Sequence, residues 1–131
     1  MTREEGLNNP GGIEHEPGIT WAGQSTAQPD PTFVSFSEPQ WGIRAIARSL
    51  RTYQRVDGVK TIAQAIERWA PPSENNTPAY IADVCQRCGL NDDVEMDFDP
   101  IMAPLVKAII VHENGQCIYP DELINLGISL A

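Results

Sequence analysis

Apolar residues recur every three or four positions over most of residues 37–131, which is the spacing of amphipathic helices. The first such stretch begins near Ser37, since Ser37 and Gln40 have the spacing of a capping box and Pro39 is compatible with a first helical turn. Its apolar stripe consists of Ile43, Ile46, Ala47 and Leu50, and the arginines lying mostly on the other side are Arg44, Arg48, Arg51 and Arg55. We predict that this helix ends near Gly58.

Two more helices are predicted before residue 90. Thr61 and Gln64 again have capping-box spacing, and the prolines at 71–72 stop the helix that follows because proline cannot continue the hydrogen-bond ladder. The Thr-Pro pair at 77–78 has the pattern of an N-cap followed by the first helical residue. Gly89 fits a left-handed C-terminal cap of that helix.

The last third of the chain predicts two helices behind an acidic connector, residues 91–99. Pro104 leaves two starts open for the first of them: either the regular helix begins there, or a short turn precedes it. Gly115 closes this helix. Residues 119–122 open a final short helix with acidic residues in its first turn, and we predict that it ends near Gly127.

Residues 1–32 are rich in Gly, Pro, Asn, Asp and Thr and show little periodicity, so we expect loops with room for one short hairpin. The first few residues are expected to be frayed. The length of 131 residues fits one domain. The pattern therefore predicts a mainly α single domain over 1–131: a helical body of about five helices, residues 37–131, behind an irregular segment, residues 1–32.

The charge balance argues against two classes of partner. Acidic residues outnumber basic ones 18 to 9, a net charge of −9 that repels phosphate backbones and argues against general nucleic-acid binding. It also argues mildly against an anionic partner, although a cleft can differ from the average surface.

Neither a membrane-spanning run nor the apolar stretch of a signal peptide is present. We expect a soluble, unprocessed protein, and if it works outside the cytoplasm, something else must carry it there.

Three cysteines, an odd number, do not make a disulfide framework. Cys85 and Cys88 form a C-x-x-C that His112 and Cys117 could complete as a zinc site. Both cysteines lie on a predicted apolar helical stripe, where cysteine acts as a small hydrophobic residue, so we expect neither a metal nor a cofactor. A nucleophile pair of Cys117 and His112 is conceivable, but no motif marks it.

Glu113 is the carboxylate best placed for chemistry. It follows the apolar residues 109–111 and precedes the helix-ending Gly115. Apolar neighbours and the negative pole of a helix C-terminus both disfavour the ionised form, so we expect its pKa to be raised. A carboxyl group that keeps its proton is what a general acid requires. The alternative is an exposed glutamate paired with His112 or Lys107.

A second group of candidates lies in residues 68–80, where polar side chains are crowded between two predicted helices. Such a loop can shape a cleft, with Glu74 and Tyr80 as its functional residues. The alternative is a plain connector between helices.

A third group is residues 8–13, which include Asn9 and two glycines, followed by Trp21 and Gln24. Glycines allow backbone groups to approach a ligand, and an indole ring can stack on a sugar. The alternative is an ordinary turn with a core tryptophan.

Taken together, these segments resemble a group of small phage virion proteins, often described only as structural proteins. The group's pattern runs from N-N-P-G-N-I through G-I-R-A-hydrophobic-A, R-W-A-P-P-x-E-N-x-T-x-x-Y-I and H-E-N-G to a C-terminal G-I. The matching segments here are residues 8–13, 42–47, 68–81, 112–115 and 127–128. One departure is Gly12, which stands where the group has asparagine.

A more distant resemblance is to lytic transglycosylases of the lysozyme superfamily. Their catalytic helix ends in Glu-Ser-Gly, and a Pro-x-x-Glu-Thr-x-x-Tyr-Val segment follows later. Residues 108–115 are similar to the catalytic helix, residues 71–81 to the later segment and residues 42–53 to the helix between them. The order differs, as in a circular permutation, which predicts that residues 6–13 pack against the end of the Glu113 helix.

This resemblance implies a lysozyme-like fold and cleavage of the β-1,4 bond between N-acetylmuramic acid and N-acetylglucosamine in peptidoglycan. Glu113 would be the general acid and base, with the transglycosylase outcome slightly favoured over hydrolysis, for which Glu74 is the candidate second carboxylate. The residues implied to bind substrate or support the site are Glu74, Tyr80, Asn114, Trp21, Gln24 and Asn9.

The implied setting is a phage virion acting in the host periplasm and cell wall, with peptidoglycan and other virion proteins as partners and no nucleic acid or membrane. The alternative is a virion structural protein, or a module that binds peptidoglycan without cutting it.

Overall fold

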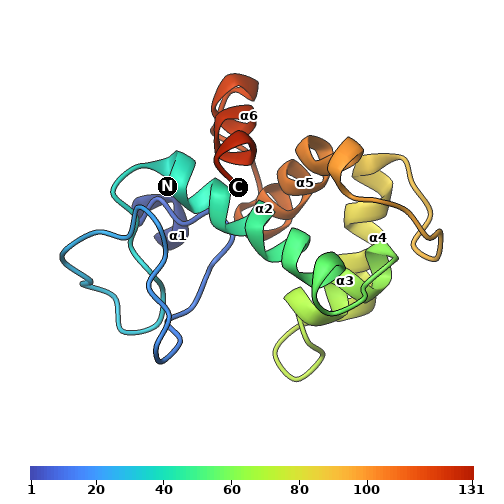
Figure 1. Cartoon of the computed structure of the whole chain (residues 1–131), viewed down its shortest axis with the longest axis horizontal. Coiled ribbons are helices and arrows are strands. Elements are labelled where there is room, and N and C mark those ends of the chain that lie inside the picture. Colours follow the sequence, from blue (N-terminus) through green and yellow to red (C-terminus); the bar gives the residue numbers. More distant parts are fainter.

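Helices form the body of the protein, whose structure, a computed structural model, describes all of residues 1–131 (Figure 1). They are α1 (Arg3–Gly6), α2 (Pro39–Arg55), α3 (Ile62–Trp69), α4 (Thr77–Cys88), the 3-10 turn η1 (Asp99–Ile101), α5 (Met102–Asn114) and α6 (Asp121–Leu130). The only β pairings are two isolated antiparallel bridges, Glu14 with Phe33 and Gln24 with Phe36. The mainly α class is therefore confirmed, with one α-helix more than expected.

The extra helix is α1, and the expectation of a frayed start is wrong. The Thr2 side chain accepts a hydrogen bond from the Glu5 amide, and the Glu5 carboxylate accepts one from the Thr2 amide at 2.6 Å. This reciprocal capping box satisfies the free amides of the first turn. Arg3 makes two hydrogen bonds to the Asp30 carboxylate, which tie α1 to the following loop.

α2 starts two residues later than Ser37, and the predicted capping box of Ser37 and Gln40 is wrong. Glu38 is the N-cap and makes no side-chain cap bond, while the Gln40 amide donates to the Glu38 carboxylate at 2.7 Å. Pro39 occupies the first turn, as its missing N–H allows. The helix ends at Arg55, before Gly58.

The capping box of Thr61 and Gln64 at the start of α3 is confirmed. At α4 the N-cap is Asn76, one residue earlier than predicted. Thr77 is buried instead, and its hydroxyl donates to the carbonyl of Ala70, which joins the end of α3 to the start of α4. Gly89 caps α4 in the left-handed conformation, as expected.

Of the two starts left open for α5, the structure has the short turn, because η1 directly precedes the helix. Gly115 closes α5 in the left-handed conformation, as predicted. The predicted end of α6 at Gly127 is wrong, since the helix continues to Leu130. A Cβ at Gly127 would lie 2.7 Å from the Ile43 Cβ and 3.0 Å from the Gln40 carbonyl oxygen. This glycine allows α6 to pack closely on α2 and does not end the helix.

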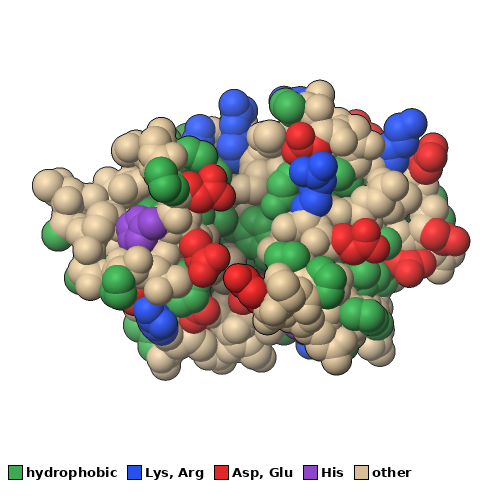
Figure 2. All heavy atoms as spheres, turned by 90° about the horizontal axis from the view of Figure 1, so that it is seen from below, with side chains coloured by type: hydrophobic (Ala, Val, Ile, Leu, Met, Phe, Trp, Pro, Cys, Tyr) green, Lys and Arg blue, Asp and Glu red, His purple; other side chains and the backbone are tan.

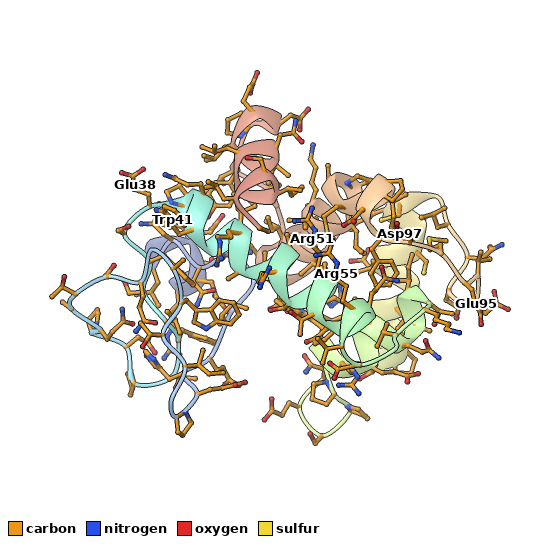
Figure 3. All side chains as sticks on the ribbon, viewed as in Figure 1. Glu38, Trp41, Arg51, Arg55, Glu95 and Asp97 are labelled. Carbon is orange, nitrogen blue, oxygen red and sulfur yellow. The ribbon has the colours of Figure 1, made fainter.

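α2 crosses the middle of the molecule, with the N-terminal segment on one side and α3 and α4 on the other (Figure 1). Its apolar face packs into a main core built mostly from α2 to α5, while Val34, Phe36 and Ala45 form a smaller cluster under the N-terminal segment. Arg51 and Arg55 extend from α2 toward the segment that carries Asp97 (Figure 3), where both pair with Asp99. None of the helices is both long and apolar enough to span a bilayer.

Candidate active site

A cleft of about 520 Å³ opens between the N-terminal segment and the connection from α3 to α4. Figure 2 shows this side of the molecule, with a hollow near its centre and acidic side chains gathered around it. Both of the irregular segments that the sequence singled out contribute walls, and Glu113 belongs to the lining. The cleft therefore brings together the N-terminal segment, the middle of the chain and the end of α5.

Glu113 lies in the last turn of α5 and is half-buried. Its Oε1 accepts a 2.8 Å hydrogen bond from the Tyr80 hydroxyl. Its Oε2 lies 3.8 Å from the position that a Cβ would take at Gly12. The carboxyl group is thus held between α4 and the N-terminal glycines at the cleft wall. It makes no ion pair with His112 or Lys107, whose partners are Asp83 and Asp121.

The surroundings of Glu113 raise its pKa above the ordinary value, chiefly because burial penalises the charged form. The hydrogen bond from Tyr80 opposes this rise, since it stabilises the carboxylate. The nearby charge of Glu4 raises the pKa further. Burial is therefore the main cause, in agreement with the expectation from the apolar neighbours in α5.

Tyr80 connects Glu113 to α3. Its ring is buried, and its hydroxyl accepts a 3.2 Å hydrogen bond from the Trp69 indole N–H while it donates to Glu113. Burial and the charge of Glu113 raise the pKa of Tyr80 far above its ordinary value, so the hydroxyl keeps its proton. The His112 ring lies over Tyr80 at 3.7 Å between centroids and bonds to Asp83. The result is a fixed donor aimed at the carboxyl group.

The predicted contact between the N-terminal segment and the end of the Glu113 helix is present. The Asn114 side chain donates to the Pro10 carbonyl at 2.8 Å and to the Ile110 carbonyl at 2.9 Å. Its carbonyl oxygen accepts from the Thr2 hydroxyl at 2.6 Å. Asn114 thus joins two walls of the cleft and is not part of its lining.

Asn9 and Gln24 also make hydrogen bonds within the N-terminal segment that forms one wall of the cleft. Asn9 is fully buried, and its amide donates to the carbonyls of Ile13 and Val34 while its oxygen accepts from the Ile13 amide. The Gln24 side chain accepts from the Trp21 amide at 3.0 Å. Neither side chain lines the cleft, whereas Trp21 does. Asn9 and Gln24 therefore shape the segment that presents Trp21.

The two glycines of residues 8–13, Gly11 and Gly12, have different structural roles. A Cβ at Gly11 would come 2.6 Å from Ile46 and 3.0 Å from Trp69, so this glycine allows close packing on the core. Gly12 has φ +64°, in the left-handed region, and a Cβ there would meet only ordinary contacts. Close packing therefore explains Gly11, and Gly12 is the glycine that faces Glu113.

Glu74 lies exposed in the loop between α3 and α4, at the cleft lining. Its side chain makes no hydrogen bond or ion pair, so of the two residues predicted to orient Glu113 only Tyr80 contacts it. The side chains of Glu74 and Tyr80, six residues apart, thus lie in different environments.

Several cleft residues were not among the candidates from the sequence, among them Glu4, Phe33 and Tyr53. Arg68 and Trp69 fall within the candidate group of residues 68–80, but neither was given a role of its own there. Glu4 was missed because the start of the chain was expected to be frayed, although Thr2 and Glu5 have the spacing of a capping box.

The cysteines lie apart from the cleft lining. Cys85 is buried in α4, Cys88 is half-buried in the last turn of the same helix, and the Cys117 thiol contacts the Tyr119 carbonyl at 3.6 Å. No group of three or more His, Cys, Asp or Glu side chains is arranged to hold a metal ion.

The chain is similar to protein P5 of Pseudoalteromonas phage PM2, with 38% identity over 122 residues. The match covers 92% of this chain and 76% of protein P5. The chain belongs to the family of protein P5. The match to the P5 family is too long to rest on one motif, and it places the chain among phage proteins. No family model matches the sequence.

Proposed function

We propose that this member of the P5 family has a lysozyme-like fold and is a virion component that cuts the glycan strands of peptidoglycan, with Glu113 as the general acid. One observation carries the proposal: a half-buried carboxyl group with a raised pKa lines an open cleft. A group of this kind can protonate a glycosidic oxygen near neutral pH. The substrate bond is the β-1,4 linkage between N-acetylmuramic acid and N-acetylglucosamine, in the host periplasm and cell wall.

The lining of the cleft suits a glycan. Its volume lies within the range of about 300–1,000 Å³ that small-molecule sites occupy. Trp21 and Tyr53 are half-buried in the lining and offer ring faces on which sugars can stack. Arg68, which pairs with Asp57 at 3.3 Å, is also in the lining and places a cation near the carboxylates that peptidoglycan carries. Tyr80, backed by Trp69, would keep the Glu113 carboxyl group aimed at the leaving oxygen.

A second candidate function is a virion structural protein, or a peptidoglycan-binding module, that cuts nothing. The acidic lining favours it, since four glutamates besides Glu113 face the cleft and repel an anionic polymer. They are Glu4, Glu14, Glu16 and Glu74. The kinship with protein P5 supports a phage protein in either case.

A zymogram and a digest of purified peptidoglycan separate the two functions. The proteins compared are the wild type, Glu113→Gln and the control Glu67→Gln, because Glu67 is exposed on α3 and outside the cleft lining. The wild type and the control should cut equally, while Glu113→Gln should lose a factor of about 10²–10⁴, the usual contribution of a general acid. No lysis by any of the three proteins would favour the non-catalytic function.

A further inference from the structure

Glu4 is a half-buried carboxylate without a partner. It projects from α1 into the cleft lining that contains Glu113. Its side chain makes no hydrogen bond and no ion pair, unlike that of its neighbour Glu5, which caps α1. A carboxylate partly withdrawn from water and left unpaired inside a cleft has its acceptor oxygens free for a ligand.

Glu4 and Glu113 both lie next to Gly12. The position that a Cβ would take at Gly12 is 3.8 Å from the Glu4 Cγ and also 3.8 Å from the Glu113 Oε2, so these two atoms are at most twice that distance apart. The Phe33 ring lies 3.6 Å from the same position. Because residue 12 has no side chain, this position next to both glutamates is left open. Glycosidases that place a water between two carboxyl groups separate them by about 6.5–9.5 Å.

The helix that carries Glu4 is anchored unusually well for its four residues. Thr2 caps it and also donates to Asn114, the residue after Glu113. Arg3 binds the Asp30 carboxylate through two nitrogens, and its guanidinium lies 4.7 Å from the centre of the Phe33 ring. These contacts fix Glu4 relative to the end of α5, which a group acting together with Glu113 requires.

Resting on the proposed function, we propose that Glu4 is the second carboxylate of the reaction: a general base that activates water, so that the outcome is hydrolysis. Glu113 gives its proton to the glycosidic oxygen as the bond from that oxygen to the anomeric carbon breaks. Glu4 takes one proton from the water as the water oxygen bonds to the anomeric carbon. The products are a free hydroxyl and a reducing sugar, and a proton passes from Glu4 to solvent while Glu113 takes one up.

This assignment replaces Glu74 as the candidate second carboxylate. Glu74 is exposed, and no contact relates it to Glu113, whereas the charge of Glu4 is close enough to raise the Glu113 pKa. The raised pKa of Glu113 suits the acid of such a pair, and hydrolysis needs a second carboxyl group as the base. A transglycosylase needs no water and no second carboxylate.

The test measures product masses and rates on purified peptidoglycan for the wild type, Glu4→Gln, Glu113→Gln and the control Glu67→Gln. Wild-type products should end in intact reducing N-acetylmuramic acid. Glu4→Gln should lose a factor of about 10² or more, as expected for removal of a general base. In Glu4→Ala, added azide should restore cleavage and give a glycosyl azide, because azide attacks without a base. A purely structural role of Glu4 would not produce that rescue.

Two results would overturn the role of Glu4 alone: wild-type products lighter by one water, which are anhydro ends, or a Glu4→Gln rate equal to that of Glu67→Gln. In both cases a loss of cleavage in Glu113→Gln would leave the proposed function standing. Absence of cleavage by the wild type, or an unaffected Glu113→Gln, would overturn both.

Discussion

The Tyr80 hydroxyl donates a 2.8 Å hydrogen bond to Glu113, a residue 33 positions further along the chain. The bond crosses from α4 to the last turn of α5, and the Trp69 indole supports it from α3. Three helices thus converge on one carboxyl group. Burial raises the pKa of that group, and this hydrogen bond limits the rise.

Tyr80→Phe should lower the rate of glycan cleavage and move the alkaline limb of the pH–rate profile to higher pH. The hydroxyl stabilises the carboxylate and so lowers the Glu113 pKa, and its removal lets that pKa rise. The measurement is kcat/KM against pH. Tyr119→Phe is the matched control, because the buried Tyr119 hydroxyl has no hydrogen-bond partner and lies outside the cleft lining. An alkaline limb that stays in place or moves down would contradict this role of Tyr80.

Glu113→Gln should make the protein more stable than the wild type at pH 7 but not at pH 4. The folded-state pKa of Glu113 is raised above its ordinary value of 4.5, so the folded state binds the proton more tightly than the unfolded state. Wild-type stability therefore falls as pH rises from about 4.5 through the raised pKa, and glutamine has no such dependence. Thermal melting of both proteins at the two pH values measures the difference. The same difference in melting temperature between Glu113→Gln and the wild type at both pH values would count against a raised pKa of Glu113.

Asn9→Ala should destabilise the protein by about 3 kcal/mol. Loss of the Asn9 side chain removes its hydrogen bonds and leaves backbone groups of Ile13 and Val34 unpaired. Urea unfolding monitors the change, and the exposed Asn91→Ala serves as the control, expected within about 0.5 kcal/mol of the wild type. A loss for Asn9→Ala no larger than that of the control would mean that Asn9 does not hold the cleft wall.

Gly127→Ala should cost about 1–3 kcal/mol, since the added methyl group would collide with Ile43 where α6 packs on α2. Gly6→Ala is a suitable comparison, because a Cβ there meets only Met1 at 3.9 Å. That change should be neutral or stabilising by up to about 1 kcal/mol. Denaturant midpoints of the two variants check the contrast, and equal stability would show that α6 can shift without cost.

Most of the helical body could be predicted because its signals are local. The capping box of Thr61 and Gln64 and the left-handed glycines 89 and 115 depend on neighbouring residues, and the structure confirms them. The errors lie where distant contacts decide. Gly127 continues its helix because Ile43 packs against it, and Thr77 turns inward to the Ala70 carbonyl, which leaves the cap to Asn76.

Part of the candidate site could also be predicted, from the local sequence around Glu113 and from the order of the motifs. The apolar residues before Glu113 already indicated a raised pKa, and the contact of residues 6–13 with the end of α5 followed from motif order. Thr2 and Glu5 do have the spacing of a capping box, but the position of Glu4 at the cleft depends on contacts of α1 with Asp30 and Asn114, which are remote in sequence. The separate burial of Tyr80 and exposure of Glu74 likewise depend on tertiary packing.

Titration of the Glu113 carboxyl group by NMR tests the central claim most directly. Glutamate labelled with ¹³C at the carboxyl carbon gives one signal per residue, and the signal missing from Glu113→Gln identifies Glu113. We predict a titration midpoint clearly above 4.5 in the wild type and a higher one in Tyr80→Phe. A midpoint at or below 4.5 would contradict the claim that this cleft keeps a proton on Glu113.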